Sequence, residues 1–337
     1  MPSSSEQPVP AHLRLRELIT SAVLAKAVSV LCELGVPDAL TGKRTNVELA
    51  NEVGADPEGL LPFLRAACAG GVLAEPELRV FELTELGQLL CESSDGEKPL
   101  CLLIGREEFD RTWANAGHGA RTGEPMFTAA YGKPFFEYVS ATPEFAAIYD
   151  AAMVSSTGLD NLLAACDFSE AGHIVDLGGG RGAVLSAILR RDPHLRGTLV
   201  ELPHVVAGAK PILAEAGVAD RVTLSPGSFF DPVPDTGDVY LLSRVIGNWS
   251  DSDSLRILRN VRAAMGPASR LVIVGNMPSG NDRTNYPLQL SFYMFALMGA
   301  RTRTYDEYAE LLEQSDLTIS RWANFPDGES IIEAVPA

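Results

Sequence analysis

The chain has 337 residues, of which 46% are hydrophobic and 21% are charged, and its formal net charge is −17. An acidic surface of this kind repels nucleic acid and anionic membranes, and no apolar run reaches the ~18 residues of a membrane span. The five cysteines are odd in number and scattered without a CxxC pair, and the five histidines have no metal-ligand spacing. We therefore expect a cytoplasmic protein without a disulfide framework, a metal site, or a nucleic-acid or membrane partner.

Residues 13–34 are apolar around most of a helical circumference, and Gly35 follows them as a suitable helix C-cap. A helix that is apolar nearly all round must be buried on all sides. Burial against a second copy of the chain, in a homodimer, is the interpretation we favour. The alternative is a helix that packs wholly within its own domain.

The next stretch has the order of a winged helix. A capped helix is expected over residues 45–54, a second helix over 60–69 and a hairpin over 72–83. Such a module can bind DNA, but its second helix carries one cation, Arg65, among apolar residues, and its surroundings are acidic. We therefore interpret residues 1–100 as a dimerisation domain.

Residues 101–165 are predicted to be a helical linker, with a helical sequence pattern over residues 100–120 and a helix with an apolar face over 145–153. Aromatic residues are dense over 131–138. Aromatic rings and a methionine just before a ligand-binding domain can wall a flat substrate pocket, or they can be plain core. The candidates for the pocket wall are Tyr131, Tyr149 and Met153.

A glycine turn follows the first strand of the third region. Residues 173–177 are apolar and β-branched, then come Gly178, Gly180 and Gly182, and residues 183–191 have helical spacing. Strand, glycine turn and helix together let backbone N–H groups approach a ligand closely. The spacing is G-x-G-x-G, which differs from the G-x-G-x-x-G of dinucleotide enzymes, and glycine can also serve packing alone.

The strand over residues 197–201 ends in Glu201, whose carboxylate can accept hydrogen bonds from both hydroxyls of a ribose. Strands and helices then alternate through residues 166–337, which predicts a Rossmann-like α/β domain with a mostly parallel sheet covered on both faces. The seven expected strands are 173–177, 197–201, 221–224, 238–242, 271–274, 317–323 and 329–335. The expected helices are 183–191, 205–216, 253–265 and 304–314.

The order of these segments resembles the small-molecule O-methyltransferases that use S-adenosylmethionine. The motifs that carry the resemblance are RTGEP (121–125), YGKPFF (131–136), Met153, VDLGGGRG (175–182), LVELPHVV (199–206), GSFFDPVP (227–234), NWSD (248–251) and GARTRT (299–304). PHLRGTLVEL (193–202) and NWSD are most similar to the bacterial anthracycline-tailoring branch, that of carminomycin O-methyltransferase and aclacinomycin hydroxylase. The resemblance implies the class I methyltransferase fold, with a winged-helix dimerisation domain at the amino end, and a small aromatic or polyketide substrate.

The resemblance also implies roles for individual residues in holding the cofactor. Gly178 and Gly180 would pack against its methionyl part, Glu201 would bind the ribose, and Leu202 would touch the adenine. The implied cofactor set is completed by Asp176, Ser228, Phe229 and Ser243. Ser228 stands where the family usually has Asp, which puts one adenine contact in doubt.

Two departures from the family concern catalysis. Gly247 replaces the histidine that takes the phenol proton in the plant enzymes, and Gly275 replaces its helper acid. We then expect Asn248 to orient the acceptor as the catalytic residue, with Asn276 and Arg303 at the rim of the substrate pocket.

Two functions remain open from the sequence. One is methyl transfer to a hydroxyl of an aromatic or polyketide-like metabolite by orientation alone, with S-adenosylhomocysteine as product. Orientation can supply about 7–11 kcal/mol, whereas a general base typically adds 10²–10⁴-fold. The other is a tailoring enzyme that keeps S-adenosylmethionine but performs decarboxylation, hydroxylation or rearrangement.

Overall fold

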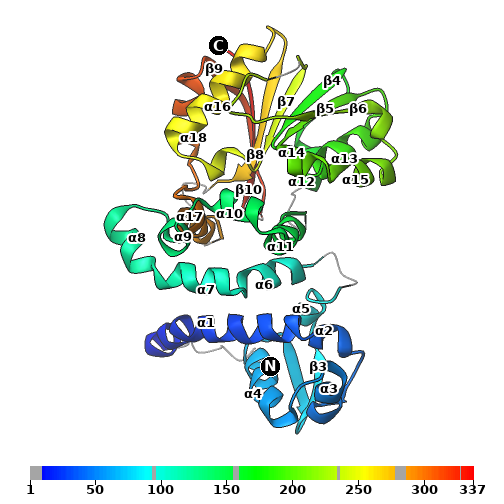
Figure 1. Ribbon diagram of the computed structural model, residues 1–337, viewed down its shortest axis with the longest axis vertical. Helices are drawn as coiled ribbons and strands as arrows, with labels where there is room; N and C mark the ends of the chain where they lie inside the picture. Colours follow the sequence, from blue (N-terminus) through cyan, green and yellow to red (C-terminus); the bar gives the residue numbers. More distant parts are fainter. Residues whose placement is uncertain (1–9, 93–95, 155–158, 234–235, 278–285, 327) are drawn as a thin grey trace, which may run out of the picture. The chain divides into compact units, whose positions relative to one another are not determined.

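The computed structural model describes residues 10–92, 96–154, 159–233, 236–277, 286–326 and 328–337. These residues form two compact units, each described here by itself (Figure 1). One unit comprises the described residues of Met1–Asp110 and Glu144–Ser156, and the other those of Arg111–Pro143 and Thr157–Ala337.

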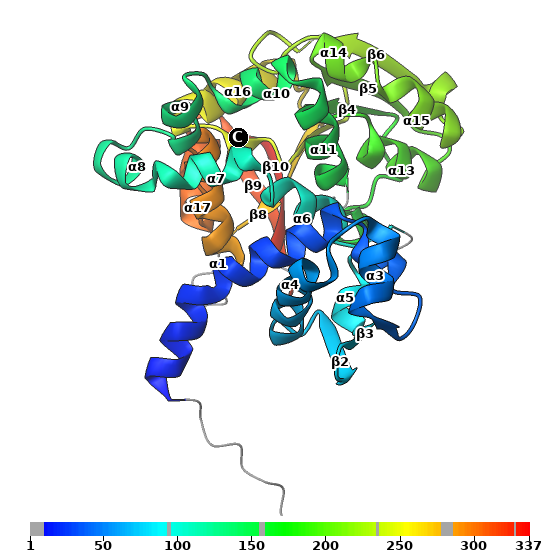
Figure 2. The ribbon, with the colours of Figure 1, turned by 60° about the horizontal axis from the view of Figure 1, so that its bottom comes forward.

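The first unit contains the expected winged helix, with β2 and β3 beside α4 (Figure 2). Its three strands form an antiparallel sheet in the order β1-β3-β2. The elements are α1 (Ala11–Glu33), α2 (Val36–Ala39), β1 (Arg44–Thr45), α3 (Asn46–Val53), α4 (Pro57–Ala69), β2 (Leu73–Glu77), β3 (Val80–Leu83), α5 (Glu85–Gln88), α6 (Lys98–Ile104), α7 (Glu107–Ala114), which runs into the second unit, and α11 (Pro143–Val154).

Local side chains explain where helix α3 begins and ends. Thr45 accepts a hydrogen bond from the Glu48 amide at 3.2 Å, and the Glu48 carboxylate accepts one from the Thr45 amide at 2.8 Å. This reciprocal pair satisfies N–H groups that the first turn leaves unpaired. Gly54, with φ 71°, ends the helix in the left-handed conformation.

Helix α1 is covered at one end only. Leu31 and Cys32 are buried near its carboxyl end, whereas Leu18 and Ile19 are 70% and 69% exposed in the single chain. The exposed set also includes Leu13, Leu15 and Val23. The amino-terminal part of α1 therefore exposes a contiguous apolar surface to solvent. Such a surface is expected of a helix that packs against a partner in an assembly.

The predicted helical region over residues 100–120 folds as three helices, α6, α7 and α8. Gly105 ends α6 and lies against Ser29 of α1, where an added Cβ would come within 2.4 Å of the serine Cβ. Close packing between distant segments thus sets a boundary that local periodicity does not reveal.

The second unit is a seven-stranded sheet with helices on both faces, as predicted. Its order is β6-β5-β4-β7-β8-β10-β9, parallel except for β10, which is antiparallel to both of its neighbours. The helices before the sheet are α8 (Ala116–Thr122), α9 (Met126–Tyr131), α10 (Phe135–Ala141) and α12 (Leu159–Ala165). Then follow β4 (His173–Leu177), α13 (Ala183–Arg191), β5 (Arg196–Glu201), α14 (Pro203–Val206), α15 (Ala209–Glu215), η1 (Ala219–Arg221), β6 (Val222–Pro226), β7 (Val239–Ser243), η2 (Ile246–Asn248), α16 (Asp251–Ala264), β8 (Arg270–Asn276), α17 (Tyr286–Met298), α18 (Tyr305–Glu313), β9 (Leu317–Asn324) and β10 (Glu329–Pro336).

Alternation along the strands divides the interior into two cores. Ile174 of β4 packs with α13 and α15 on one face, and Val175 packs with α16 and α18 on the other. Figure 1 shows these helix pairs on opposite sides of the sheet. Strands buried on both faces must be apolar throughout, which explains the continuous apolar runs in the sequence.

Two helical predictions need correction. The helix expected over residues 205–216 is two helices, α14 and α15, because Gly208 interrupts the run and caps the second one. Helix α17 was not anticipated, because its residues are apolar on all sides and show no helical period.

The strand order reverses beside β4, which has β5 on one side and β7 on the other. At such a switch point the connections leave toward opposite faces and open a crevice at the carboxyl ends of the strands. The glycine turn follows β4 at this point.

None of the helices in the described ranges combines the length and the apolarity that a bilayer crossing requires.

Candidate active site

The glycine turn after β4 is shaped by left-handed backbone at Gly178, Gly180 and Gly182, whose φ angles are 72°, 59° and 81°. An added Cβ at Gly178 would lie 3.0 Å from both Phe229 and Val245, so no side chain fits there. At Gly180 no described atom lies within 4 Å of an added Cβ. The turn therefore packs against the protein at Gly178 and faces open space at Gly180.

Glu201 lies against this turn from the end of β5. Its Oε2 accepts a hydrogen bond from the Gly180 amide at 3.0 Å, and its Oε1 accepts one from the Leu202 amide at 2.7 Å. The next residue, Leu202, is a large apolar residue with 39% of its surface exposed beside the Glu201 carboxylate. A carboxylate held by two backbone amides has a fixed direction and still has lone pairs for a ligand's hydroxyls.

Asp176 lies beneath the turn and is fully buried. An added Cβ at Gly179 would be 2.1 Å from Asp176 Oδ2, and no donor among the described residues reaches either carboxylate oxygen. Burial, with a smaller contribution from the like charge of Glu201, raises the pKa of the Asp176 carboxyl to about 7. This side chain is covered by the turn at Gly179 and does not line the open space at Gly180, so its part in cofactor binding stays a prediction.

An aromatic cluster lies at the loop after β6, next to the glycine turn. Trp249 meets Phe230 edge-on at 4.7 Å and Phe229 at 5.7 Å between ring centroids, and Phe136 of α10 stacks on it at 6.0 Å. Ser228 shapes this loop, because its hydroxyl accepts a hydrogen bond from the Phe230 amide at 3.2 Å. The rings therefore link the glycine turn to the aromatic segment before the sheet.

Residues 243–249, after β7, form the opposite side of the crevice. Ser243 ends the strand, and a short 3-10 turn, η2, brings Asn248 back so that its Nδ2 donates to the Arg244 carbonyl at 3.0 Å. That bond leaves the amide oxygen, Oδ1, as the acceptor of the Asn248 side chain. In the turn between Ser243 and Asn248, a Cβ added at Gly247 would have no described atom within 4 Å.

The arrangement fits S-adenosylmethionine on observations of this chain. Glycine leaves room for a ligand at the turn, Glu201 offers oxygen acceptors beside it, and Leu202 and Phe229 offer apolar surface. The Glu201 carboxylate also suits a cationic ligand. No cluster of three possible metal ligands occurs in the described part of the chain.

Family models match most of the chain. Residues 113–317 match the O-methyltransferase domain, and residues 16–93 match the O-methyltransferase dimerisation domain. The chain belongs to the O-methyltransferase family. It is 35% identical to phenazine O-methyltransferase PhzM of Lysobacter antibioticus, with 97% of each chain covered. Aclacinomycin 10-hydroxylase RdmB of Streptomyces purpurascens is also 35% identical, over 91% of this chain and 83% of that protein.

Solved structures agree on the fold and the cofactor. A crystal structure of LaPhzM superimposes with a TM-score of 0.91 at 35% identity, covering 98% of this chain and all of that one. The O-methyltransferase NcsB1 from neocarzinostatin biosynthesis, crystallised with S-adenosylmethionine and 2-hydroxy-5-methyl naphthoic acid, gives a TM-score of 0.80 at 29% identity, covering 93% and 96%. The protein is therefore an S-adenosylmethionine-dependent methyltransferase.

Arg303 of this O-methyltransferase does not lie at a pocket rim, contrary to the expectation from the sequence. It is 1% exposed, and its guanidinium donates to the Ile246 carbonyl at 2.9 Å, to the Trp249 carbonyl at 2.7 Å and to the Asp251 carboxylate at 2.7 Å. The side chain is used inside the protein to hold the η2 turn in place.

The other substrate-wall candidates are distributed between the two units. Tyr131 stacks on Phe127 at 4.6 Å with the Arg111 guanidinium 4.6 Å from its ring centre, and Asn276 ends β8 at the same sheet edge as Ser243. Tyr149 and Met153 belong to α11 of the first unit. Their contact with substrate stays a prediction.

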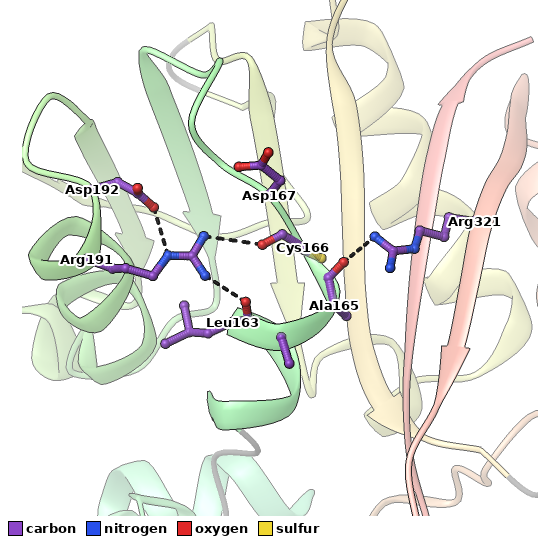
Figure 3. Close-up of a pocket in the computed structure, with 8 residues that line it drawn as sticks. Leu163, Ala165, Cys166, Asp167, Arg191, Asp192 and Arg321 are labelled. Atoms are coloured by element: carbon purple, nitrogen blue, oxygen red, sulfur yellow. Dashed lines mark hydrogen bonds and ion pairs between the residues drawn. The ribbon is translucent and has the colours of Figure 1, made fainter.

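A cavity of about 580 Å³ lies at the other end of α13, away from the glycine turn (Figure 3). Arg191 donates to the Leu163 carbonyl at 2.7 Å and to the Cys166 carbonyl at 3.3 Å, and Arg321 donates to the Ala165 carbonyl. These cations satisfy the last carbonyls of α12 and oppose its dipole. The two arginines that line the cavity are therefore used in capping α12, and the cavity is separate from the glycine turn.

Arg244 and Glu329 belong to no motif of the sequence, yet they are joined by an ion pair of 3.2 Å at the carboxyl edge of the sheet. The local sign of a role in the site was that Arg244, a cation, directly follows the end of strand β7. Its partner stands 85 residues away, where nothing in the local pattern points to it.

Proposed function

We propose that this enzyme transfers the methyl group of S-adenosylmethionine to a hydroxyl on a planar aromatic or polyketide-type secondary metabolite. Two relatives support the substrate class: one is named for phenazine, and one was crystallised with a naphthoic acid. The aromatic cluster of Phe136, Phe229, Phe230 and Trp249 offers ring surfaces next to the glycine turn that suit such a substrate.

The cofactor would lie along the glycine turn. Gly180 would face its methionyl part, with the backbone of Gly178 beside it; Glu201 would face its ribose, and Leu202 and Phe229 its adenine. Ser243 would lie at its carboxylate end, with Ser228 in the adenine loop. When bound, S-adenosylmethionine supplies an electrophilic methyl group beside a sulfonium cation. The task left to the chain is to hold an acceptor oxygen in line with that methyl and to keep water out.

Asn248 would orient the acceptor. With one Nδ2 hydrogen donated to the Arg244 carbonyl, the second Nδ2 hydrogen can donate to an ionised acceptor oxygen and aim it, and Oδ1 can accept the hydrogen bond of a neutral hydroxyl. An amide does not remove a proton at neutral pH, so this residue would direct the oxygen without ionising it.

The observation that carries this mechanism is the empty position at Gly247, where the plant-type relatives place a histidine. Tyr308, whose hydroxyl would lie 3.8 Å from a Cβ at Gly275, cannot replace it, because burial raises the pKa of that phenol to about 12. The best acceptors would therefore be hydroxyls already acidified by a neighbouring carbonyl or quinone, which are ionised near neutral pH.

We also propose how the chain is organised for this reaction. Residues 1–100 would pair two copies through the exposed face of α1, consistent with the match to a dimerisation domain. Residues 101–165 would wall the substrate pocket, residues 166–337 would bind the cofactor, and the enzyme would act in the cytoplasm.

The test is turnover of a panel of polycyclic phenols and hydroxyquinones, followed by mass spectrometry. We expect a product heavier by one methylene unit and an equal amount of S-adenosylhomocysteine. Substrate consumed while the cofactor stays methylated would show non-methylating chemistry and refute the proposal.

Asn248→Ala tests the role of the amide. A hydrogen bond to a charged oxygen is worth about 1.5–3 kcal/mol, so turnover should fall roughly 10- to 100-fold. The dissociation constant of S-adenosylhomocysteine, measured by calorimetry, should stay unchanged. Equal losses in turnover and cofactor affinity would contradict the assignment.

A further inference from the structure

Arg244 has a backbone conformation that residues with side chains rarely adopt. It is the first residue after β7, and its φ is 57°. Its amide still donates to the Val274 carbonyl at 2.8 Å, so the β7–β8 ladder continues up to this residue before the chain turns away. A left-handed non-glycine residue persists only where its surroundings hold it.

The buried Glu329 side chain holds the far end of Arg244 and is itself held by Asn161. Its guanidinium donates to Glu329 Oε1 at 3.2 Å, and Glu329 Oε2 accepts a hydrogen bond from Asn161 Nδ2 at 3.1 Å. Glu329 is 2% exposed and begins β10 directly opposite Asn276, at the carboxyl edge of the parallel strands. The guanidinium is thus tied to β10 and, through the carboxylate, to α12.

The backbone of Arg244 in turn holds Asn248. The Arg244 carbonyl accepts a hydrogen bond from Asn248 Nδ2 at 3.0 Å, which fixes the directions of the second Nδ2 hydrogen and of Oδ1. Arg303 holds the same loop from its other side through the Ile246 and Trp249 carbonyls. The direction of the Asn248 amide therefore depends on the place of the Arg244 carbonyl.

We propose that Arg244 is a positioning residue for methyl transfer: anchored by Glu329 and Asn161, it fixes the left-handed turn whose carbonyl aims the Asn248 amide at the acceptor. This inference rests on the role proposed for Asn248. Arg244 itself needs no contact with substrate or cofactor.

The test is a double-mutant cycle between Arg244→Met and Asn248→Ala. Arg244→Met should lower kcat about 10-fold, with the dissociation constant of S-adenosylhomocysteine unchanged within 2-fold. In the Asn248→Ala background the same change should cost less than 2-fold, because the residue it acts through is gone. Equal losses in both backgrounds would show a general structural role and overturn the inference.

Companion variants keep the test valid if the loss of the Arg244 cation beside the buried Glu329 carboxylate impairs folding. Arg244→Met/Glu329→Gln removes both charges and should repeat the kcat loss, whereas Arg244→Lys should restore part of the activity. Arg65→Met is the matched control, since Arg65 also pairs with a glutamate, at 3.0 Å, but in the first unit. Full activity in the double variant would overturn the proposal.

A readout independent of turnover is the side-chain amide resonance of Asn248, assigned by its loss in Asn248→Ala. It should shift in Arg244→Met and stay in place in Arg65→Met, and an unchanged resonance in Arg244→Met would count against the inference. The two hypotheses also fail differently. Full activity of Asn248→Ala would remove the role of the amide, whereas an impaired Asn248→Ala with an intact Arg244→Met would remove only the role of Arg244.

Discussion

A histidine placed at position 247 would test whether this methyltransferase works without a general base. No described atom lies within 4 Å of a Cβ added at Gly247, and its φ lies outside the left-handed region, so an imidazole can be introduced there without backbone strain. Gly247→Ala is the matched control, because it adds the Cβ without the base.

The size of the effect follows from acid–base equilibria. A phenol with a pKa of ~10 is ionised to about one part in 10³ at pH 7, so a base can recover at most about that factor. General bases typically contribute 10²–10⁴-fold, and without the helper acid at position 275 we expect about 10²-fold for such a phenol. An acceptor with a pKa of ~6 is already ionised, and its rate should change less than about 2-fold.

The assay is the pH dependence of kcat for both acceptors. With the weakly acidic phenol, the wild-type rate should rise about tenfold per pH unit between roughly pH 6 and 9, following ionisation of the acceptor itself. The histidine variant should instead level off above the imidazole pKa, near ~6.5. A wild-type rate with this phenol that does not change over the same range would reveal a base within the enzyme and refute the reasoning.

Three further predictions follow from burial and backbone geometry. Gly180→Ala should weaken S-adenosylhomocysteine binding about tenfold by calorimetry, because its methyl enters the open space of the crevice. Gly178→Ala should instead lower the thermal unfolding temperature more, since its methyl would press on two side chains at 3.0 Å; the reverse order would contradict both placements. Arg303→Met should lower the free energy of unfolding in urea by about 3 kcal/mol or more, because two backbone carbonyls and a carboxylate lose their donor; a loss below about 1 kcal/mol would contradict its structural role. Asp176 has its pKa raised from 3.8 to about 7, so the folded protein holds a proton that the unfolded chain has released, and stability should fall as pH rises through this window. Asp176→Asn should flatten that slope by up to about 1.4 kcal/mol per pH unit, and an unchanged slope would exclude Asp176 as its source.

The main features of the fold could be read from the sequence because they follow from local rules. The strand, glycine turn and helix around Gly180 use the freedom of glycine, and Glu201 stands at a strand end that periodicity alone reveals. The capping pair of Thr45 and Glu48 likewise depends on residues three apart. The cofactor crevice could be anticipated for the same reason, since parallel strands bring their carboxyl ends to one edge of the sheet.

Other features depend on groups that meet only when the chain is folded. Arg303 is a charged residue in a loop, and nothing local shows that carbonyls more than fifty residues away will bury its guanidinium. The exclusion of Asp176 from the crevice by Gly179, and the pairing of Arg244 with Glu329, likewise arise from packing across strands and turns. Short-range patterning thus determined which elements form and where a ligand binds, whereas tertiary packing decided which polar side chains face the crevice and which ones hold it in shape. The reason is physical: a buried polar group must find its partners wherever the fold places them, at any separation along the chain.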